Sequence, residues 1–210
     1  MIILCGGEKG GTGKSTLATN LAVWLAHQGK DVLLVDTDRQ LTSSRWNDRR
    51  HALTDEIPVV HCAEKHGNVF YALCDWAGRY DEIVVDAGGR DSEELRTALV
   101  AAQVVYLPLR ASQPDIETSV HMHELVSLAR GLNPTLKAHW LLTMAPSGDC
   151  GDTAAAAQAL SHLPSITLSE VVIRDRKIYR DAMATGHGVS EMLNDKAQAE
   201  IDALGQEIYR

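Results

Sequence analysis

A glycine-rich segment near the N-terminus constrains the fold of this chain more than any other feature. It follows the apolar run Ile2–Cys5, precedes a helix-length stretch at residues 15–28, and reads GGEKGGTGKST from Gly6 to Thr16. Glycines let successive backbone N–H groups curl around a phosphate, and the N-terminus of the following helix adds partial positive charge. A strand, such a loop and a helix in succession predict a phosphate-binding site in an α/β fold.

Three side chains at the end of this segment have predicted contacts to a bound nucleotide. Lys14 would reach the β- and γ-phosphates, the Ser15 hydroxyl would ligate Mg²⁺, and Thr16 would lie near the α-phosphate. Glu8 stands where the strict phosphate-loop pattern has its first glycine. A chance match in a glycine-rich turn is the alternative, and the position after the first strand argues against it. The predicted nucleotide-binding residues are Gly10, Gly11, Thr12, Gly13, Lys14, Ser15 and Thr16.

The rest of the chain alternates short apolar runs with helix-length segments. The runs are mostly continuous, as in strands buried on both faces of a parallel sheet. We therefore predict an α/β fold of the P-loop NTPase class: a three-layer, doubly wound, mostly parallel sheet flanked by helices, in one domain over residues 1–210. Strands are expected at residues 2–5, 32–35, 59–61, 83–85, 104–109, 139–143 and 171–173, and helices at 15–28, 68–78, 92–102, 115–130, 153–163 and 175–185.

Composition narrows the class of protein. With 45% hydrophobic and 23% charged residues, the 210-residue chain is globular rather than disordered, collagen-like or a coiled coil. The net charge of −8 argues against general electrostatic binding of the whole chain to nucleic acid or to an anionic membrane. No membrane span or signal peptide is evident, so we expect a cytoplasmic protein. We expect reduced thiols at Cys5, Cys62, Cys74 and Cys150.

Two later strands are predicted to end in aspartates at one edge of the sheet. Residues 32–35 precede Asp36 and Asp38, and residues 83–85 precede Asp86. Side chains at the carboxyl ends of parallel strands face the ligand crevice, beside the phosphate loop. Phosphoryl transfer needs carboxylates there, one near Mg²⁺ and one that positions the attacking water. The structural alternative is that Asp36 and Asp38 merely end a strand.

The form KGGTGKST resembles the deviant phosphate loop of the ParA/MinD family of ATPases. In that family an additional lysine, here Lys9, touches the partner's phosphates across a nucleotide-sandwiched dimer; a solvated lysine is the alternative. The run DTDRQ is similar to the family's D-x-D-P-Q motif, with Arg39 in place of proline. The resemblance implies that Asp38 orients the lytic water, that Asp36 supports the magnesium shell, and that Asp86 holds Mg²⁺ through water.

The segment DAGGRDSEELRTAL, which starts at Asp86, resembles small plasmid-partition, ParF-like members of the family, in which residues 87–90 would sense the γ-phosphate. The resemblance implies an ATPase that uses ATP and Mg²⁺, dimerises with ATP and hydrolyses it slowly. It further implies partition of a plasmid or chromosome: the ATP dimer binds non-specific DNA on the nucleoid, and a ParB-like centromere-binding partner stimulates hydrolysis and release. The alternatives are a MinD-like or other positioning ATPase acting on membrane or protein cargo, and a metabolic enzyme that phosphorylates a small substrate.

A basic cluster late in the chain is the candidate DNA-binding surface. On the predicted helix at 175–185 it would form one basic face, with a solvated helix, partly neutralised by two aspartates, as the alternative. A second cluster at 45, 49 and 50 is expected to be solvated surface. The tail at 196–210 lacks the basic amphipathic pattern of a membrane-binding helix, so we expect it to pack on the domain. The predicted DNA-binding residues are Arg174, Arg176, Lys177 and Arg180.

Overall fold

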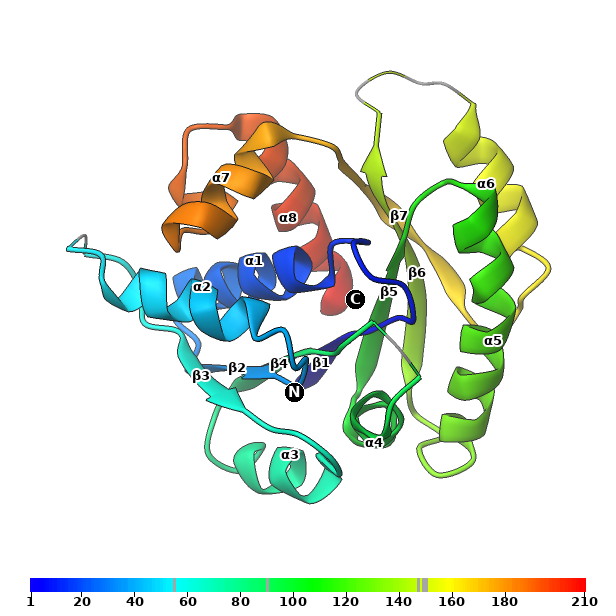
Figure 1. The fold of residues 1–210 in the computed structure, drawn as a ribbon, viewed down its shortest axis with the longest axis horizontal. Helices are drawn as coiled ribbons and strands as arrows, with labels where there is room; N and C mark the ends of the chain where they lie inside the picture. Colours follow the sequence, from blue (N-terminus) through cyan, green and yellow to red (C-terminus); the bar gives the residue numbers. More distant parts are fainter. Residues whose placement is uncertain (55, 90, 147, 149–150) are drawn as a thin grey trace.

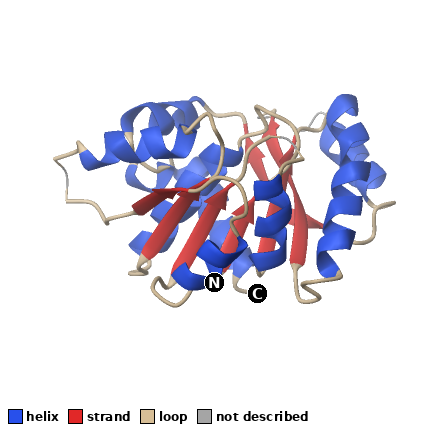
Figure 2. Cartoon of the chain, turned by 60° about the horizontal axis from the view of Figure 1, so that its bottom comes forward, coloured by secondary structure: helices blue, strands red, loops and turns tan. Residues whose placement is uncertain are grey.

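The computed structural model describes residues 1–54, 56–89, 91–146, 148 and 151–210. Its strands form one seven-stranded sheet in the order β3-β2-β4-β1-β5-β6-β7, and every neighbouring pair is parallel (Figures 1 and 2). This confirms the predicted doubly wound α/β class. The strands are β1 (Ile2–Cys5), β2 (Val32–Asp36), β3 (His61–Glu64), β4 (Glu82–Asp86), β5 (Val104–Leu109), β6 (Lys137–Ala145) and β7 (Thr167–Arg174).

Helices cover both faces of the sheet. One face carries α3, α4, α5 and α6, and the other carries α1, α2, α7 and α8, with the short 3-10 helix η1 (Figure 1). The bounds are α1 (Lys14–His27), α2 (Thr42–His51), α3 (Phe70–Trp76), α4 (Glu93–Ala101), α5 (Gln113–Arg130), α6 (Asp152–Leu160), α7 (Lys177–Thr185), η1 (Val189–Glu191) and α8 (Asp195–Ile208).

The apolar runs became strands because both of their faces are covered. Every residue of β1, β2, β4 and β5 is buried. Alternate side chains enter two separate cores, so that Leu4 packs on one side of the sheet and Ile3 on the other. Such continuous burial is what a parallel sheet between two helical layers requires. The four central strands therefore fix a rigid edge at which loops can hold functional groups.

Several predicted element bounds differ from the structure, and one helix was not predicted. The edge strand β3 spans His61–Glu64 instead of residues 59–61, and its polar first and last residues are exposed, which leaves little apolar pattern. Helix α2 was not predicted, because its sequence TSSRWNDRRH has no apolar periodicity and only one large apolar residue, Trp46. Helix α7 begins at Lys177 rather than at 175, since the Asp175 N–H still bonds the Ala145 carbonyl of β6 at 2.8 Å.

The C-terminal helix α8 packs on the domain, as predicted for residues 196–210. Ile201 and Leu204 are buried against the same core as α1. Gly205 lies so close to the Trp24 ring that a Cβ there would stand 2.5 Å from it, which explains a glycine inside a helix. Asp202 accepts a hydrogen bond from the Trp24 indole N–H at 2.9 Å. No helix in the described ranges combines the length and the apolar character needed to cross a membrane.

The cluster at 45, 49 and 50 was predicted to be solvated, and this is wrong for Arg50. Its guanidinium bonds both oxygens of Glu191 at 2.7 and 2.8 Å, and each side chain is only 4% exposed. Arg50 also lies over the Trp46 ring, 5.5 Å from its centroid. Burial alone would raise the pKa of Glu191, but hydrogen bonds from Arg50 and from the Gly188 N–H outweigh burial and lower it. The ion pair thus ties α2 to η1.

Replacing Arg50 by alanine should destabilise the fold strongly, by about 3–5 kcal/mol, because it removes the guanidinium and leaves the buried Glu191 charge with only His27 and the Gly188 N–H as partners. The free energy of unfolding in urea measures this loss. A double replacement by methionine at Arg50 and Glu191 is the matched control, since it removes both charges and should cost clearly less. An Arg50→Ala protein as stable as the unchanged chain would contradict the buried pair.

Candidate functional site

The phosphate-loop segment lies between β1 and α1, at the carboxyl edge of the sheet. Gly13 precedes α1 in the left-handed conformation, with φ at 93°, a geometry that glycine adopts without strain. Within the described part of the chain, no side-chain hydrogen bond caps the first turn of α1. The N–H groups of that turn and the partial positive charge of the helix are therefore available to an anion, as the sequence predicted.

Lys14 is buried at the centre of this loop. Its Nζ donates a hydrogen bond of 2.5 Å to the carbonyl oxygen of Lys9. Burial lowers the pKa of Lys14, while the charges of Asp86 and Asp38 act in the opposite direction. Gly89, in the loop after β4, comes so close that a Cβ there would stand 3.1 Å from Nζ and 2.9 Å from the Gly10 nitrogen. The structure therefore brings the phosphate loop and the loop after β4 together.

Asp86, at the end of β4, presents a carboxylate with one open oxygen. Its Oδ2 accepts a hydrogen bond of 2.7 Å from the Ser43 hydroxyl, whereas Oδ1 is buried and has no partner among the described residues. Burial raises the pKa of Asp86 to about 7, and the Asp36 charge acts in the same direction, against Ser43, Ser15 and Lys14. A buried oxygen without a protein partner can accept an ion or a water, and its place beside Ser15 and Lys14 suits Mg²⁺.

Asp36 lies beside Asp86 in the register of the neighbouring strands β2 and β4, but its carboxylate oxygens make different contacts. Oδ1 accepts from the Asp38 N–H at 3.0 Å, and Oδ2 accepts from the Ser44 N–H at 2.9 Å. Burial raises the pKa of Asp36 against these hydrogen bonds. Asp36 therefore holds the following loop and the start of α2 in position. Its predicted support of a magnesium shell would act through these contacts.

Asp38 lies in the half-exposed turn that follows β2. Its Oδ1 accepts from the Gln40 N–H at 2.9 Å. Its Oδ2 faces the loop after β4, because a Cβ on Gly88 would stand 3.4 Å from it. Asp38, Gly10, Gly88 and Gly89 line one pocket of about 510 Å³. The carboxylate predicted to orient a water thus shares a pocket with the phosphate loop. The predicted sensor residue Arg90 and Cys150 lie outside the described residues.

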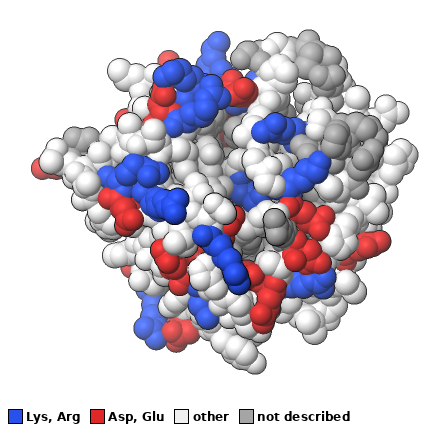
Figure 3. All heavy atoms as spheres, in the orientation of Figure 1, with Lys and Arg blue, Asp and Glu red and all other residues white. Residues whose placement is uncertain are grey.

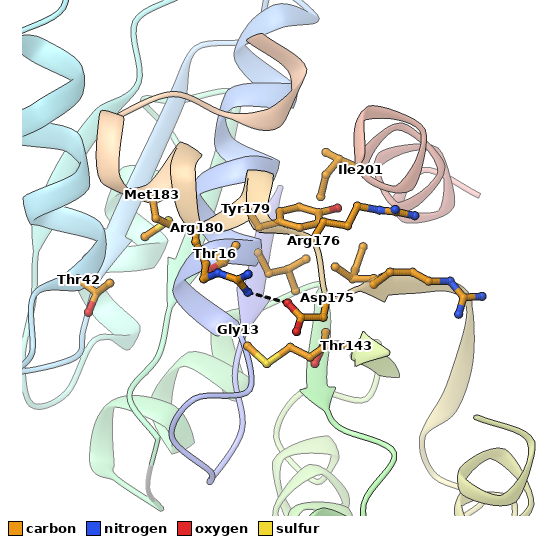
Figure 4. Close-up of a pocket in the computed structure, with 14 residues that line it drawn as sticks. Gly13, Thr16, Thr42, Thr143, Asp175, Arg176, Tyr179, Arg180, Met183 and Ile201 are labelled. Atoms are coloured by element: carbon orange, nitrogen blue, oxygen red, sulfur yellow. Dashed lines mark hydrogen bonds and ion pairs between the residues drawn. The ribbon is translucent and has the colours of Figure 1, made fainter. Parts of the chain in front are cut away.

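A second pocket, of about 340 Å³, is lined by Gly13 and by the start of α1 (Figure 4). Gly13 and Thr16 line it from the phosphate loop and α1, and Tyr179 and Ile201 line it from α7 and α8. Its mainly apolar lining next to a phosphate site suits a nucleobase, because base sites are concave and apolar with few polar groups. A base bound in this pocket would lie beside the N-terminus of α1.

Three site residues were missed from the sequence. Ser43 holds Asp86, but it belongs to the unpredicted helix α2. Thr143 donates hydrogen bonds to the carbonyls of Thr12 and Leu109, at 2.8 and 3.2 Å, and so ties β6 to the phosphate loop. Met144 lines the apolar pocket with a positive φ of 52°, a strained conformation for its residue type. Only the position of Thr143 at the carboxyl edge of the sheet was a usable signal.

The candidate DNA-binding residues do not form the single helical face that was predicted. Arg174 ends β7 and Arg176 caps α7, while Lys177 and Arg180 belong to α7 itself. On the face shown in Figure 3, Lys and Arg side chains are interspersed with Asp and Glu. The contacts of the four are Arg174 with the Pro146 carbonyl at 2.7 Å, Arg176 with Glu200 at 2.7 Å, Lys177 with Asp181 at 2.8 Å, and Arg180 with Asp175 at 2.7 Å.

These contacts separate the four residues into two pairs. Arg174 and Arg176 contribute to the apolar pocket, and the Arg176 side chain is only 19% exposed. Lys177 and Arg180 are 79% and 67% exposed, although Arg180 also lines the mouth of that pocket. Exposed ion pairs are weak and exchange readily for other partners. Lys177 and Arg180 are therefore the two more accessible cations of the four.

Comparisons with known proteins identify the family of this chain. "Maintenance of carboxysome distribution protein A" of Halothiobacillus neapolitanus is 28% identical over 202 residues, which covers 94% of this chain and 90% of that protein. The chromosome-partitioning ATPase Soj of Thermus thermophilus is 31% identical over 157 residues, 62% of this chain and 63% of that protein.

Among solved structures, the Cyanothece McdA–ATP complex has a TM-score of 0.79 at 14% identity and covers 99% of this chain and 96% of that one, which shows a shared fold. The family described as "CobQ/CobB/MinD/ParA nucleotide binding domain" matches residues 3–203. The chain therefore belongs to the CobQ/CobB/MinD/ParA family of nucleotide-binding domains.

Proposed function

We propose that this chain is an ATP-gated switch that drives DNA partition: it dimerises around Mg·ATP, binds non-specific DNA as that dimer, and leaves it when a ParB-like partner stimulates hydrolysis. As a member of its family it is an ATPase, with ATP and Mg²⁺ as cofactors. One observation carries the proposal. The phosphate loop, Asp38 and the loop after β4 meet at a pocket of about 510 Å³, where a terminal phosphate and an attacking water would lie together.

The residues divide the chemistry between them. The loop from Gly10 to Thr16 would bind the phosphates, with Lys14 on the β- and γ-phosphates. Ser15 and Asp86 would hold Mg²⁺, and Asp36 would support that shell by fixing the loop beside it. When bound, Mg²⁺ supplies positive charge that neutralises the phosphate oxygens. Asp38 would orient the water for in-line attack, so that catalysis rests on positioning and electrostatics.

Lys9 is the residue on which the proposed dimerisation depends. It belongs to the same loop, and its carbonyl oxygen holds the Lys14 ammonium group in place. In the sandwich that the ParA resemblance implies, its side chain would cross to the nucleotide of the partner copy. ATP would then couple two chains, because each phosphate group would be contacted by both copies.

Lys9→Ala should spare ATP binding by the monomer but abolish ATP-driven dimerisation and turnover, because only the contact across the sandwich is removed. Light scattering with ATP and phosphate release measure the two effects. Lys9→Arg is the matched variant, since it keeps the charge and should keep part of the dimerisation. Equal dimerisation of Lys9→Ala and the unchanged chain would exclude the sandwich.

The test of the DNA role is retention on a non-specific duplex with ATP, with ADP and without nucleotide, at two salt concentrations. Retention only with ATP, falling steeply with salt, is expected, because phosphate contacts release counterions. A double replacement of Lys177 and Arg180 by alanine should weaken retention. Lys137→Ala, at the first residue of β6 and thus at the opposite edge of the sheet, is the control. ATP-driven dimerisation without any DNA retention would refute DNA carriage.

The second candidate is a positioning ATPase whose cargo is a protein assembly or a membrane. The relative that spans 94% of this chain has a name that refers to carboxysome distribution, which favours a protein cargo. The same switch would serve either cargo, because hydrolysis only toggles surface binding. Flotation with liposomes and ATP would detect the membrane form. Binding of the ATP-bound dimer to a protein assembly, with no stimulation of hydrolysis by a centromere-binding protein, would favour the protein cargo.

A further inference from the structure

Arg39 is a residue of the catalytic pocket to which the family motif assigns no role. It stands where the motif D-x-D-P-Q has proline, between Asp38 and Gln40. The structure keeps the turn without proline: the Leu41 N–H bonds the Asp38 carbonyl at 2.9 Å, so that Arg39 occupies the first central position. Proline is favoured at that position of such a turn. The conformation of the turn therefore does not require arginine at position 39.

The Arg39 side chain is exposed, lines the 510 Å³ pocket, and makes no hydrogen bond or ion pair with any residue that the structure describes. Among the described residues, the other charged side chains that line that pocket are the carboxylates of Asp38 and Glu94. Glu94 is already engaged, because it accepts from the Gly67 N–H at 2.8 Å. Arg39 is thus an unpaired cation on the wall of a pocket that must receive a highly charged anion.

The position of the pocket indicates which part of the anion Arg39 meets. Gly89 lines the same pocket and approaches the Lys14 Nζ, which would hold the β- and γ-phosphates from inside the loop. Arg39 enters from the turn after β2, next to the carboxylate that would orient the water. A planar guanidinium binds two phosphate oxygens at once. Lys14 and Arg39 would therefore contact the terminal phosphate from two directions.

We propose that Arg39 binds the terminal phosphate of the nucleoside triphosphate in its own subunit and so lets the chain distinguish a triphosphate from a diphosphate. The inference rests on the proposed nucleotide site but goes beyond it, because the family's motif has proline at this position. A diphosphate has no group within this pocket, so its affinity does not depend on Arg39.

The test is equilibrium binding of two probes, the non-hydrolysable triphosphate AMPPNP and ADP, each with Mg²⁺, at protein concentrations where the chain is monomeric. Arg39→Pro keeps the turn and removes the cation. Arg39→Lys keeps the positive charge but lacks the planar guanidinium that binds two oxygens at once. Arg39→Pro should raise the dissociation constant of AMPPNP about tenfold and leave that of ADP within about twofold. For Arg39→Lys, the dissociation constant of AMPPNP should lie between those of the unchanged chain and of Arg39→Pro. Arg45→Ala, an exposed arginine on α2, is the control and should change neither.

Three outcomes would overturn the inference. Equal loss of affinity for both probes would mean that Arg39 only maintains the loop. If Arg39→Pro left both affinities unchanged but weakened retention on DNA, Arg39 would be a DNA-contacting residue instead. If the chain without any substitution bound neither AMPPNP nor ADP, the proposed nucleotide site itself would be refuted. Failure of the Arg39 inference alone can therefore be distinguished from failure of the proposed function.

Discussion

Lys14→Ala is expected to abolish nucleotide binding. Lys14 is buried where it would face the phosphates, and the neighbouring carboxylates of Asp86 and Asp38 are held toward the same site. Removing the ammonium group leaves those negative charges to repel the phosphates. Charged hydrogen bonds contribute about 1.5–3 kcal/mol each, so the loss of two should weaken ATP binding by at least about 100-fold.

Calorimetric titration with ATP and Mg²⁺ measures this effect. Lys30→Ala is a suitable control, because Lys30 is an exposed lysine that follows the same helix α1 and should leave affinity unchanged. A thermal melt of each variant separates lost binding from lost folding. Full affinity in a folded Lys14→Ala protein would show that the glycine-rich loop is not the phosphate site.

The phosphate loop and the two aspartate-bearing strands were predictable because their signals are local. A continuous apolar run predicts a buried strand, and the loop residues needed for a phosphate follow one another in sequence. Asp86 could be placed beside Lys14 from the sequence alone, since both follow strands of one parallel sheet. The structure adds that β4 and β1 are direct neighbours.

What could not be predicted depends on contacts between distant segments. Ser43 reaches Asp86 only because α2 packs beside β2, and the polar sequence of α2 carries no helical pattern. Arg176 was predicted to be a surface cation, yet Glu200 of α8 accepts its hydrogen bonds and its side chain is only 19% exposed. Arg50 likewise pairs with Glu191, far along the chain. A single sequence shows charges but not their partners.

Asp38→Ala is expected to bind ATP, to dimerise, and to remain in that state because hydrolysis stops. The carboxylate of Asp38 is held by the Gln40 N–H on one oxygen and keeps the other toward the loop after β4. That geometry leaves one oxygen to orient a water beside the terminal phosphate. Its removal should lower turnover by about 10²–10⁴-fold, the usual contribution of a positioned carboxylate.

Two measurements on the same samples check this expectation: phosphate release under saturating ATP, and the dimer fraction by size exclusion in ATP. Asp48→Ala, an exposed aspartate on α2, is the matched control and should turn over normally. Turnover at the normal rate in Asp38→Ala would remove Asp38 from catalysis and leave the site without a group to orient the water. A loss of ATP affinity instead would mean that the turn after β2 belongs to the binding site itself, because Asp38 also fixes the backbone that carries Arg39.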